Sequence, residues 1–108
     1  MSERRTHPRI PLENILYVHI VSAGLELPAV LLDISICGAR MGFPPDQALP
    51  PTGSDVLFKN APLLAELLEN RTATVIWGAG VQCGVRFTRH LDTSLEYIAE
   101  LLQSEIFY

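Results

Sequence analysis

Short runs of β-branched and other apolar residues, separated by glycine and proline, fill most of the first 87 positions. Such runs predict strands, because β-branched residues favour extended chain and glycine or proline interrupts it. Ser22-Ala23-Gly24 and Gly78-Ala79-Gly80 predict two hairpin turns, and the proline-rich segment 43–53 predicts a loop, since proline lacks the N–H that a sheet needs. The six expected strands are residues 15–21, 27–34, 39–43, 55–58, 72–77 and 81–87.

Two other segments have helical spacing. Residues 62–69 combine strong helix formers with leucines at i, i+4 spacing, and predict a short helix between the fourth and fifth strands. Whether this leucine-rich segment is core or a partner surface stays open. Thr93 and Glu96 have the spacing of a capping box, which predicts a C-terminal helix over 92–105. Its expected apolar face consists of Leu95, Ile98, Leu102 and Ile106.

These elements predict a mainly β protein, a small six-stranded antiparallel barrel with a C-terminal helix over its end or an open side. The 108 residues suit one domain, and 48% hydrophobic residues exclude a disordered chain. We expect a flexible N-terminal arm over 1–10 and the barrel over 14–88. Apolar runs fall short of the roughly 18 residues that span a membrane, so no membrane insertion is expected.

Charge is distributed unevenly. The net charge is −4, with 8 basic and 12 acidic residues, which argues against a nucleic acid polymer as partner. Arg4, Arg5 and Arg9 nevertheless gather in the first nine positions, opposed by Glu3 alone. Such a cluster suits one small dianion, and arginine presents a planar fork of donors that matches phosphate and base edges.

The remaining reactive residue types suggest no catalysis or metal binding. Cys37 and Cys83 do not form a C-x-x-C pair, and we expect both to be buried thiols in a reducing cytosol. His7, His19 and His90 lack the mutual spacing of metal ligands. The N-terminus has no apolar stretch behind its positive charges, so a secretory signal is not expected and a cytoplasmic location is.

Two polar clusters are not explained by the core. Arg5 and Arg9 precede the first strand, and Asp33, Ser35 and Gly38 end the second. The separation of 24 positions between Arg9 and Asp33 suits one hairpin out and back, so the clusters should meet at one end of the barrel. Gly38 is expected to permit a positive φ in the turn.

Arginine forks together with a carboxylate can encircle guanine. Its O6 and N7 are paired acceptors for a guanidinium, and its N1–H and N2–H₂ groups are donors to a carboxylate. Adenine would place an amino donor against the arginine, a mismatch of roughly 1–3 kcal/mol per bidentate contact. The expected ligand is therefore a guanine nucleotide with charged phosphates.

The clusters resemble the paired signature of the PilZ domain, a bacterial receptor for cyclic di-GMP. Arg5-x-x-x-Arg9 is followed by Asp33-x-Ser35-x-x-Gly38, and Gly84-Val85-Arg86-Phe87 is similar to a late-strand stretch of the family. The resemblance covers residues 3 to about 103. It implies that Arg5 and Arg9 grip phosphate and the guanine Hoogsteen edge, that Asp33 and Ser35 bind guanine and backbone groups, and that Gly38 leaves room for the ligand.

Two further positions follow from the same resemblance. The residue before the first motif arginine influences whether one nucleotide or an intercalated pair binds, and Arg4 there favours two molecules per chain. Trp77, the single tryptophan, lies where some family members place an aromatic ring beneath a base. We expect ligand binding to order the arm, and the ordered chain to bind an effector protein or a second copy of itself as a homodimer. No separate cofactor is expected.

Other interpretations compete with this one. The arginines of the arm can be a solvated terminus, and Asp33 and Ser35 can cap a turn. Arg40 and Arg86 either face solvent, which is the simpler interpretation, or rim the site. A PilZ-like adaptor that binds proteins and no nucleotide is the alternative function. An enzyme is disfavoured, because no G-x-S-x-G elbow surrounds Ser35 and the candidate site lacks paired carboxylates.

Overall fold

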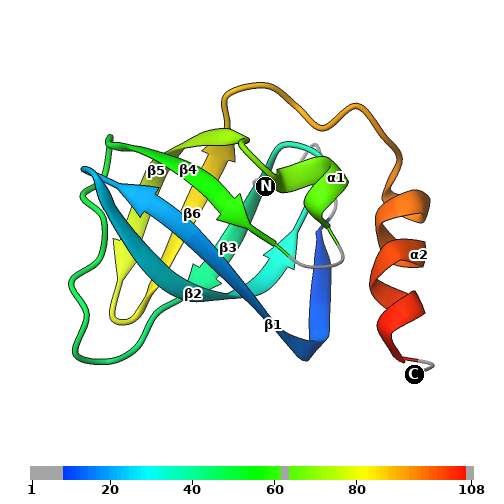
Figure 1. Ribbon diagram of the computed structural model, residues 1–108, viewed down its shortest axis with the longest axis horizontal. Helices are drawn as coiled ribbons and strands as arrows, with labels where there is room; N and C mark the ends of the chain where they lie inside the picture. The colour runs from blue at the N-terminus through cyan, green and yellow to red at the C-terminus, as the bar shows by residue number, and fades with distance from the viewer. Residues whose placement is uncertain (1–8, 62–63, 107–108) are drawn as a thin grey trace, which may run out of the picture.

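The computed structural model describes residues 9–61 and 64–106 and confirms a closed antiparallel barrel with a C-terminal helix (Figure 1). Around the barrel the strands follow the order β1-β2-β3-β6-β5-β4, and a short helix separates β4 from β5. The elements are β1 (Ile10–Ser22), β2 (Leu25–Ile34), β3 (Gly38–Gly42), β4 (Asp55–Asn60), α1 (Ala65–Leu68), β5 (Thr72–Ala79), β6 (Gln82–Phe87) and α2 (Leu95–Ile106).

Both expected hairpins form, with one shifted along the chain. Ala23 and Gly24 turn β1 into β2 with φ of 52° and 81°, the left-handed pair of a tight two-residue turn. The second turn consists of Gly80 and Val81, because β5 continues through Ala79. Gly80 has φ of 61°, so the glycine that the turn requires is the last of the predicted triplet.

The first strand begins at Ile10, earlier than expected, so the N-terminal arm ends before this residue. Ile10 pairs with Ile34 and Pro11 pairs with Asp33, although residue 10 was assigned to the arm and the barrel was expected from residue 14. The ladder is irregular between Pro11 and Leu16, and β1 bends sharply in this stretch (Figure 1). Pairing before the bend fixes the start of β1 beside the end of β2.

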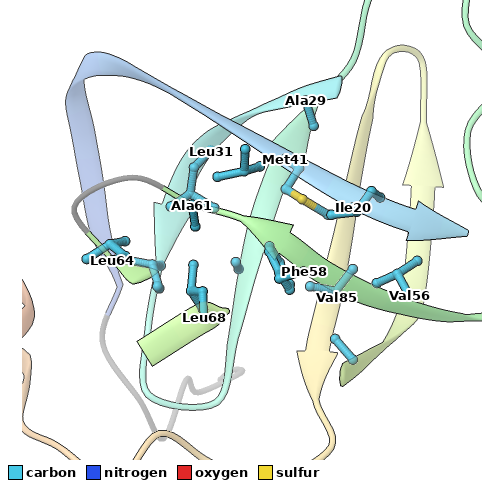
Figure 2. Packing of buried hydrophobic residues seen from close by; sticks show 14 of the residues in the cluster. Ile20, Ala29, Leu31, Met41, Val56, Phe58, Ala61, Leu64, Leu68 and Val85 are labelled. Carbon is cyan, nitrogen blue, oxygen red and sulfur yellow. The ribbon is translucent and has the colours of Figure 1, made fainter. Parts of the chain in front are cut away.

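The leucine-rich segment belongs to the core. Leu64 and Leu68 are fully buried, and Leu67 is nearly so. In Figure 2, Leu64 and Leu68 point from α1 and its approach toward the apolar side chains inside the barrel, with Phe58 of β4 among them. Because α1 is a single turn, its stability comes from this packing rather than from helix propensity. The segment therefore closes one end of the barrel.

The C-terminal helix begins one residue later than its predicted cap. The hydroxyl of Ser94 accepts the Tyr97 N–H at 3.1 Å, and the Ser94 carbonyl accepts the Ile98 N–H at 3.2 Å. Ser94 is thus the N-cap, and the prediction of Thr93 is wrong. The helix begins after Ser94 because the hydroxyl and the carbonyl of this residue both accept N–H groups of the first turn. Ile98 is fully buried, and the Tyr97 hydroxyl donates to Glu66 of α1 at 2.6 Å. Within the described part of the chain, no helix is long and apolar enough to cross a membrane.

We predict that Leu68→Ala lowers the free energy of unfolding by about 2–5 kcal/mol, because the truncated side chain leaves a cavity in a closed core. Urea denaturation followed by circular dichroism measures the change. Leu25→Ala is the matched control, since Leu25 is 65% exposed and its truncation should shift the free energy by less than about 0.5 kcal/mol. Equal effects of the two substitutions would contradict the assignment of α1 to the core.

The two cysteines differ in accessibility, which corrects the expectation that both are buried. Cys83 lies inside the barrel with no exposed surface, and burial raises the pKa of its thiol to about 11. Cys37 is half-buried in the turn between β2 and β3.

We predict that iodoacetamide at about pH 8 alkylates Cys37 alone in the folded protein, because Cys83 stays protonated and enclosed, and alkylates both thiols in guanidinium chloride. Mass spectrometry counts the adducts. Cys37→Ala should leave the folded protein unmodified, and rapid labelling of Cys83 in that variant would mean that the barrel opens.

Candidate functional site

Five strands contribute to one row of residues across the outer surface of the barrel. Pro11 on β1 pairs with Asp33 on β2, and Asp33 pairs with Arg40 on β3. Arg40 pairs in turn with Gly84 on β6, and Gly84 pairs with Trp77 on β5. Paired residues of neighbouring strands project to the same face. The register therefore gathers one residue from each of five strands into one strip of surface.

Asp33 reaches this strip because β2 contains a bulge. Ala29 and Leu31 are buried, so strict alternation would point residue 33 into the core as well. The register shifts between Leu31 and Asp33, and Ile34 is fully buried in its place. One extra residue in a strand reverses the faces of those that follow. The carboxylate thus lies outside the barrel.

A second bulge does the same for Trp77. Ala73 and Val75 of β5 are buried, and alternation would bury residue 77 next. The register shifts between Val75 and Trp77, and the Trp77 side chain is 38% exposed on the outer face. Asp33 and Trp77 are two of the side chains expected from the sequence to contact the base, and local irregularities of the ladder turn both of them outward.

Glycine at position 84 provides the space that the indole of Trp77 occupies. A Cβ atom on Gly84 would collide with Nε1 of Trp77 and lie 2.6 Å from Cε2. Gly84 is itself buried, although its neighbours Cys83 and Val85 point inward. The indole therefore lies against the backbone of β6 at Gly84, while part of Trp77 remains open to solvent.

Asp33 is held between two guanidinium groups. Nη1 of Arg9 donates to Oδ1 of Asp33 at 3.0 Å, and Nε of Arg40 donates to Oδ2 at 2.9 Å. Only 10% of the Asp33 side chain is exposed, against 24% for Arg9 and 40% for Arg40. Nη1 of Arg40 also donates to the Gln82 side chain at 3.3 Å. A nearly buried carboxylate is stabilised by such charge-assisted bonds.

Ser35 and Gly38 build the turn that presents Asp33. The Ser35 hydroxyl accepts the N–H groups of Cys37 and Gly38 at 3.3 and 3.2 Å, and the Ser35 N–H donates to the Gly38 carbonyl at 2.8 Å. Ser35 is fully buried. Its observed contacts are those of a turn-capping residue.

The expected positive φ at Gly38 is wrong. Among the described glycines, Gly24, Gly53 and Gly80 have positive φ, and Gly38 does not belong to them. The constraint is close approach instead, because a Cβ at position 38 would collide with the carbonyl oxygen of Val85 on β6.

A hollow of about 440 Å³ lies over the row. Arg9, Asp33 and Arg40 form its charged wall, and Trp77 lies across from them over Gly84. Pro11 and Ala39 complete the lining. A base that stacks on the indole would therefore have hydrogen-bonding groups of both charges within the same hollow.

Three of the residues that the sequence predicts for the site line this hollow, namely Arg9, Asp33 and Trp77. The sequence does not predict the other four, which are Pro11, Ala39, Arg40 and Gly84. Of the two interpretations of Arg40, facing solvent or rimming the site, the structure supports the second, because Arg40 pairs with Asp33 in the charged wall. The turn supplies the missing signal, since closing the chain from Ser35 to Gly38 brings Asp33 opposite Arg40. Arg86 is exposed, as expected, and does not line the hollow. Arg4 and Arg5 lie outside the described residues, as does His7. Among the described side chains, no three His, Cys, Asp or Glu residues gather as a metal site.

Comparison with known proteins agrees with this architecture. Eight solved chains match, among them the structure of Bacillus subtilis inhibitor of motility (MotI/DgrA), with a TM-score of 0.55 at 16% identity. That match covers 97% of this chain and 51% of the other, so the chain spans about half the length of the solved protein, and at this identity it shows the fold alone. No curated protein matches. The model of the PilZ domain matches residues 3–104, and the chain belongs to the PilZ domain family.

Proposed function

We propose that this protein is a receptor for cyclic di-GMP that signals to a partner protein. The family consists of receptors and adaptors rather than enzymes. The observation that carries the proposal is the hollow itself, in which the paired carboxylate of Asp33 and an exposed Trp77 face the same space. The motif residues Arg9 and Asp33, 24 positions apart, are joined there by a direct ion pair.

The chemistry of the lining suits guanine. The Asp33 carboxylate can accept the N1–H and N2–H₂ donors of the base, and an arginine fork can donate to O6 and N7. Stacking on Trp77 would contribute about 1–3 kcal/mol per base. Phosphate would be neutralised by Arg9 together with Arg4 and Arg5, and Arg4 underlies the proposal of two nucleotides per chain.

Ser35 and Gly38 have indirect roles in this proposal. Both belong to the turn that sets where Asp33 lies, and neither lines the hollow. Arg9 contacts Asp33, and the proposed ordering of the arm by ligand concerns the residues that precede Arg9. An ordered arm beside the hollow would form a new surface for an effector or a second copy of the chain, in the bacterial cytoplasm.

We predict that Arg9→Ala and Asp33→Ala each weaken cyclic di-GMP binding by at least about tenfold, because each removes a charge-assisted contact. Titration followed by Trp77 fluorescence and calorimetry gives affinity and stoichiometry. Arg89→Ala is the matched control, since it removes an exposed guanidinium from a different part of the surface and should leave affinity unchanged.

Other ligands separate the alternatives. Cyclic di-AMP should bind more weakly than cyclic di-GMP, and equal affinities would contradict recognition of the guanine edges. Two molecules per chain would support the assignment of Arg4, and one would refute it. A chain that binds neither nucleotide at tens of micromolar concentration would instead be an adaptor that works through protein contacts alone.

The contact between Trp77 and Gly84 gives a separate prediction. Gly84→Ala should displace the indole, shift its fluorescence and weaken nucleotide binding by about tenfold, because stacking on one base is lost. The fold should survive, since the side chain can rotate away. Gly78→Ala is the control, as its Cβ would meet only Cδ1 of Leu49, at 3.3 Å, and the Gln82 carbonyl oxygen, at 3.9 Å. Unchanged affinity in Gly84→Ala would exclude stacking on Trp77.

A further inference from the structure

Arg40 is held on two sides by the barrel itself. It lies within β3, donates through Nε to Asp33 of β2 at 2.9 Å, and donates through Nη1 to Gln82 of β6 at 3.3 Å. These contacts span three adjacent strands. A planar guanidinium fixed by two separate acceptors loses most of its rotational freedom before any ligand arrives.

Arg9 is held differently. It precedes the first residue of β1, and within residues 9–61 and 64–106 its side chain makes a single hydrogen bond, from Nη1 to Oδ1 of Asp33. Arg9 and Arg40 thus share one carboxylate, each through its own oxygen. One of the two is built into the middle of the sheet, and the other lies at the open end of a strand.

The carboxylate has little free surface while both arginines cover it. Only 10% of the Asp33 side chain is exposed. An ionised carboxylate has about four acceptor positions, so chemistry allows further donors, but the covering side chains leave little room for a base. A guanine that hydrogen-bonds to Asp33 must therefore displace one of the two guanidinium groups. The displaced group should be the one with fewer hydrogen bonds to the described residues, which is Arg9.

We propose that Arg40 is a permanent positioning residue for Asp33 and that Arg9 is its exchangeable partner. Arg40 stays on Oδ2 when ligand binds and directs the carboxylate toward the N1–H and N2–H₂ edge of guanine. Arg9 leaves Oδ1 and pairs with the nucleotide. This inference rests on the proposed binding of cyclic di-GMP. It assigns base specificity to Arg40, through Asp33, and general attraction for the anion to Arg9.

A ligand that lacks one guanine donor separates these roles. Cyclic di-IMP carries hypoxanthine, which keeps N1–H, O6 and N7 but lacks the 2-amino group that Asp33 would accept. The wild-type protein should prefer cyclic di-GMP by about tenfold, the worth of one hydrogen bond to a charged acceptor. Asp33→Asn should reduce this preference to less than about threefold, because the carboxylate that accepts the 2-amino group is lost. This variant therefore gives the affinity ratio expected when Asp33 no longer recognises the base.

The test compares Arg40→Met with Arg9→Met, two substitutions that each remove one guanidinium from the same hollow. Arg40→Met should lose the preference for cyclic di-GMP, as Asp33→Asn does, because Arg40 no longer orients the Asp33 carboxylate toward the base. Arg9→Met should weaken both ligands by a similar factor and keep the preference. Gln82→Ala, which removes only the tether of Arg40, should reduce the preference partly. It also carries the test if Arg40→Met does not fold, as judged by circular dichroism.

Three results would contradict these roles of Arg40 and Arg9. If Arg40→Met weakens both ligands equally, or if Arg9→Met abolishes the preference while Arg40→Met retains it, the assignment of roles is wrong. A folded Arg40→Met or Gln82→Ala protein with the wild-type preference would also overturn it. Absence of cyclic di-GMP binding by the wild-type protein would instead refute the proposed function, and equal binding of both nucleotides by wild type would refute base reading by Asp33.

Discussion

The alternation of a β-strand between its two faces is the constraint on which this site depends. A barrel of six strands has an interior filled by side chains, so every second residue of each strand must be apolar and inward. Asp33 and Trp77 both occupy positions that strict alternation would point into that core. A bulge just before each of them reverses which face of the strand the following side chains occupy. The same irregularities that interrupt the hydrogen-bond ladder therefore create the charged and aromatic walls of the hollow.

The turn after β2 sets the second half of the geometry. The Ser35 hydroxyl closes it by accepting hydrogen bonds from two backbone N–H groups, and Gly38 lets β3 approach the Val85 carbonyl of β6. This close fit brings Asp33 opposite Arg40. A carboxylate with 10% of its side chain exposed would be costly without that cation, because removing one partner leaves a desolvated charge. Ser35 and Gly38 thus contribute to the site by shaping the turn, while the ligand contacts that we propose belong to other residues.

Local pattern in the sequence was sufficient for the strand order along the chain, the proline-rich loop and the presence of both helices. It was insufficient where the outcome depends on neighbouring strands. The pairing of Ile10 with Ile34 extends β1 beyond its apolar run, and the choice of Ser94 over Thr93 as N-cap depends on where α2 docks. Arg40 resembles any polar residue on an outward strand position, and its role emerges only from the register with Asp33 and the reach to Gln82.

Closure of the barrel also limits how a partner can recognise it. Each described strand has a hydrogen-bonded neighbour on both sides, since β4 pairs with β1 and with β5 to complete the ring. Recognition by strand addition needs a row of unpaired backbone amides and carbonyls along a sheet edge. Where the ladders are continuous, this ring provides none. Recognition by the effector that we propose would then depend on side chains and loops, and the proposed nucleotide on the outer wall would change that kind of surface.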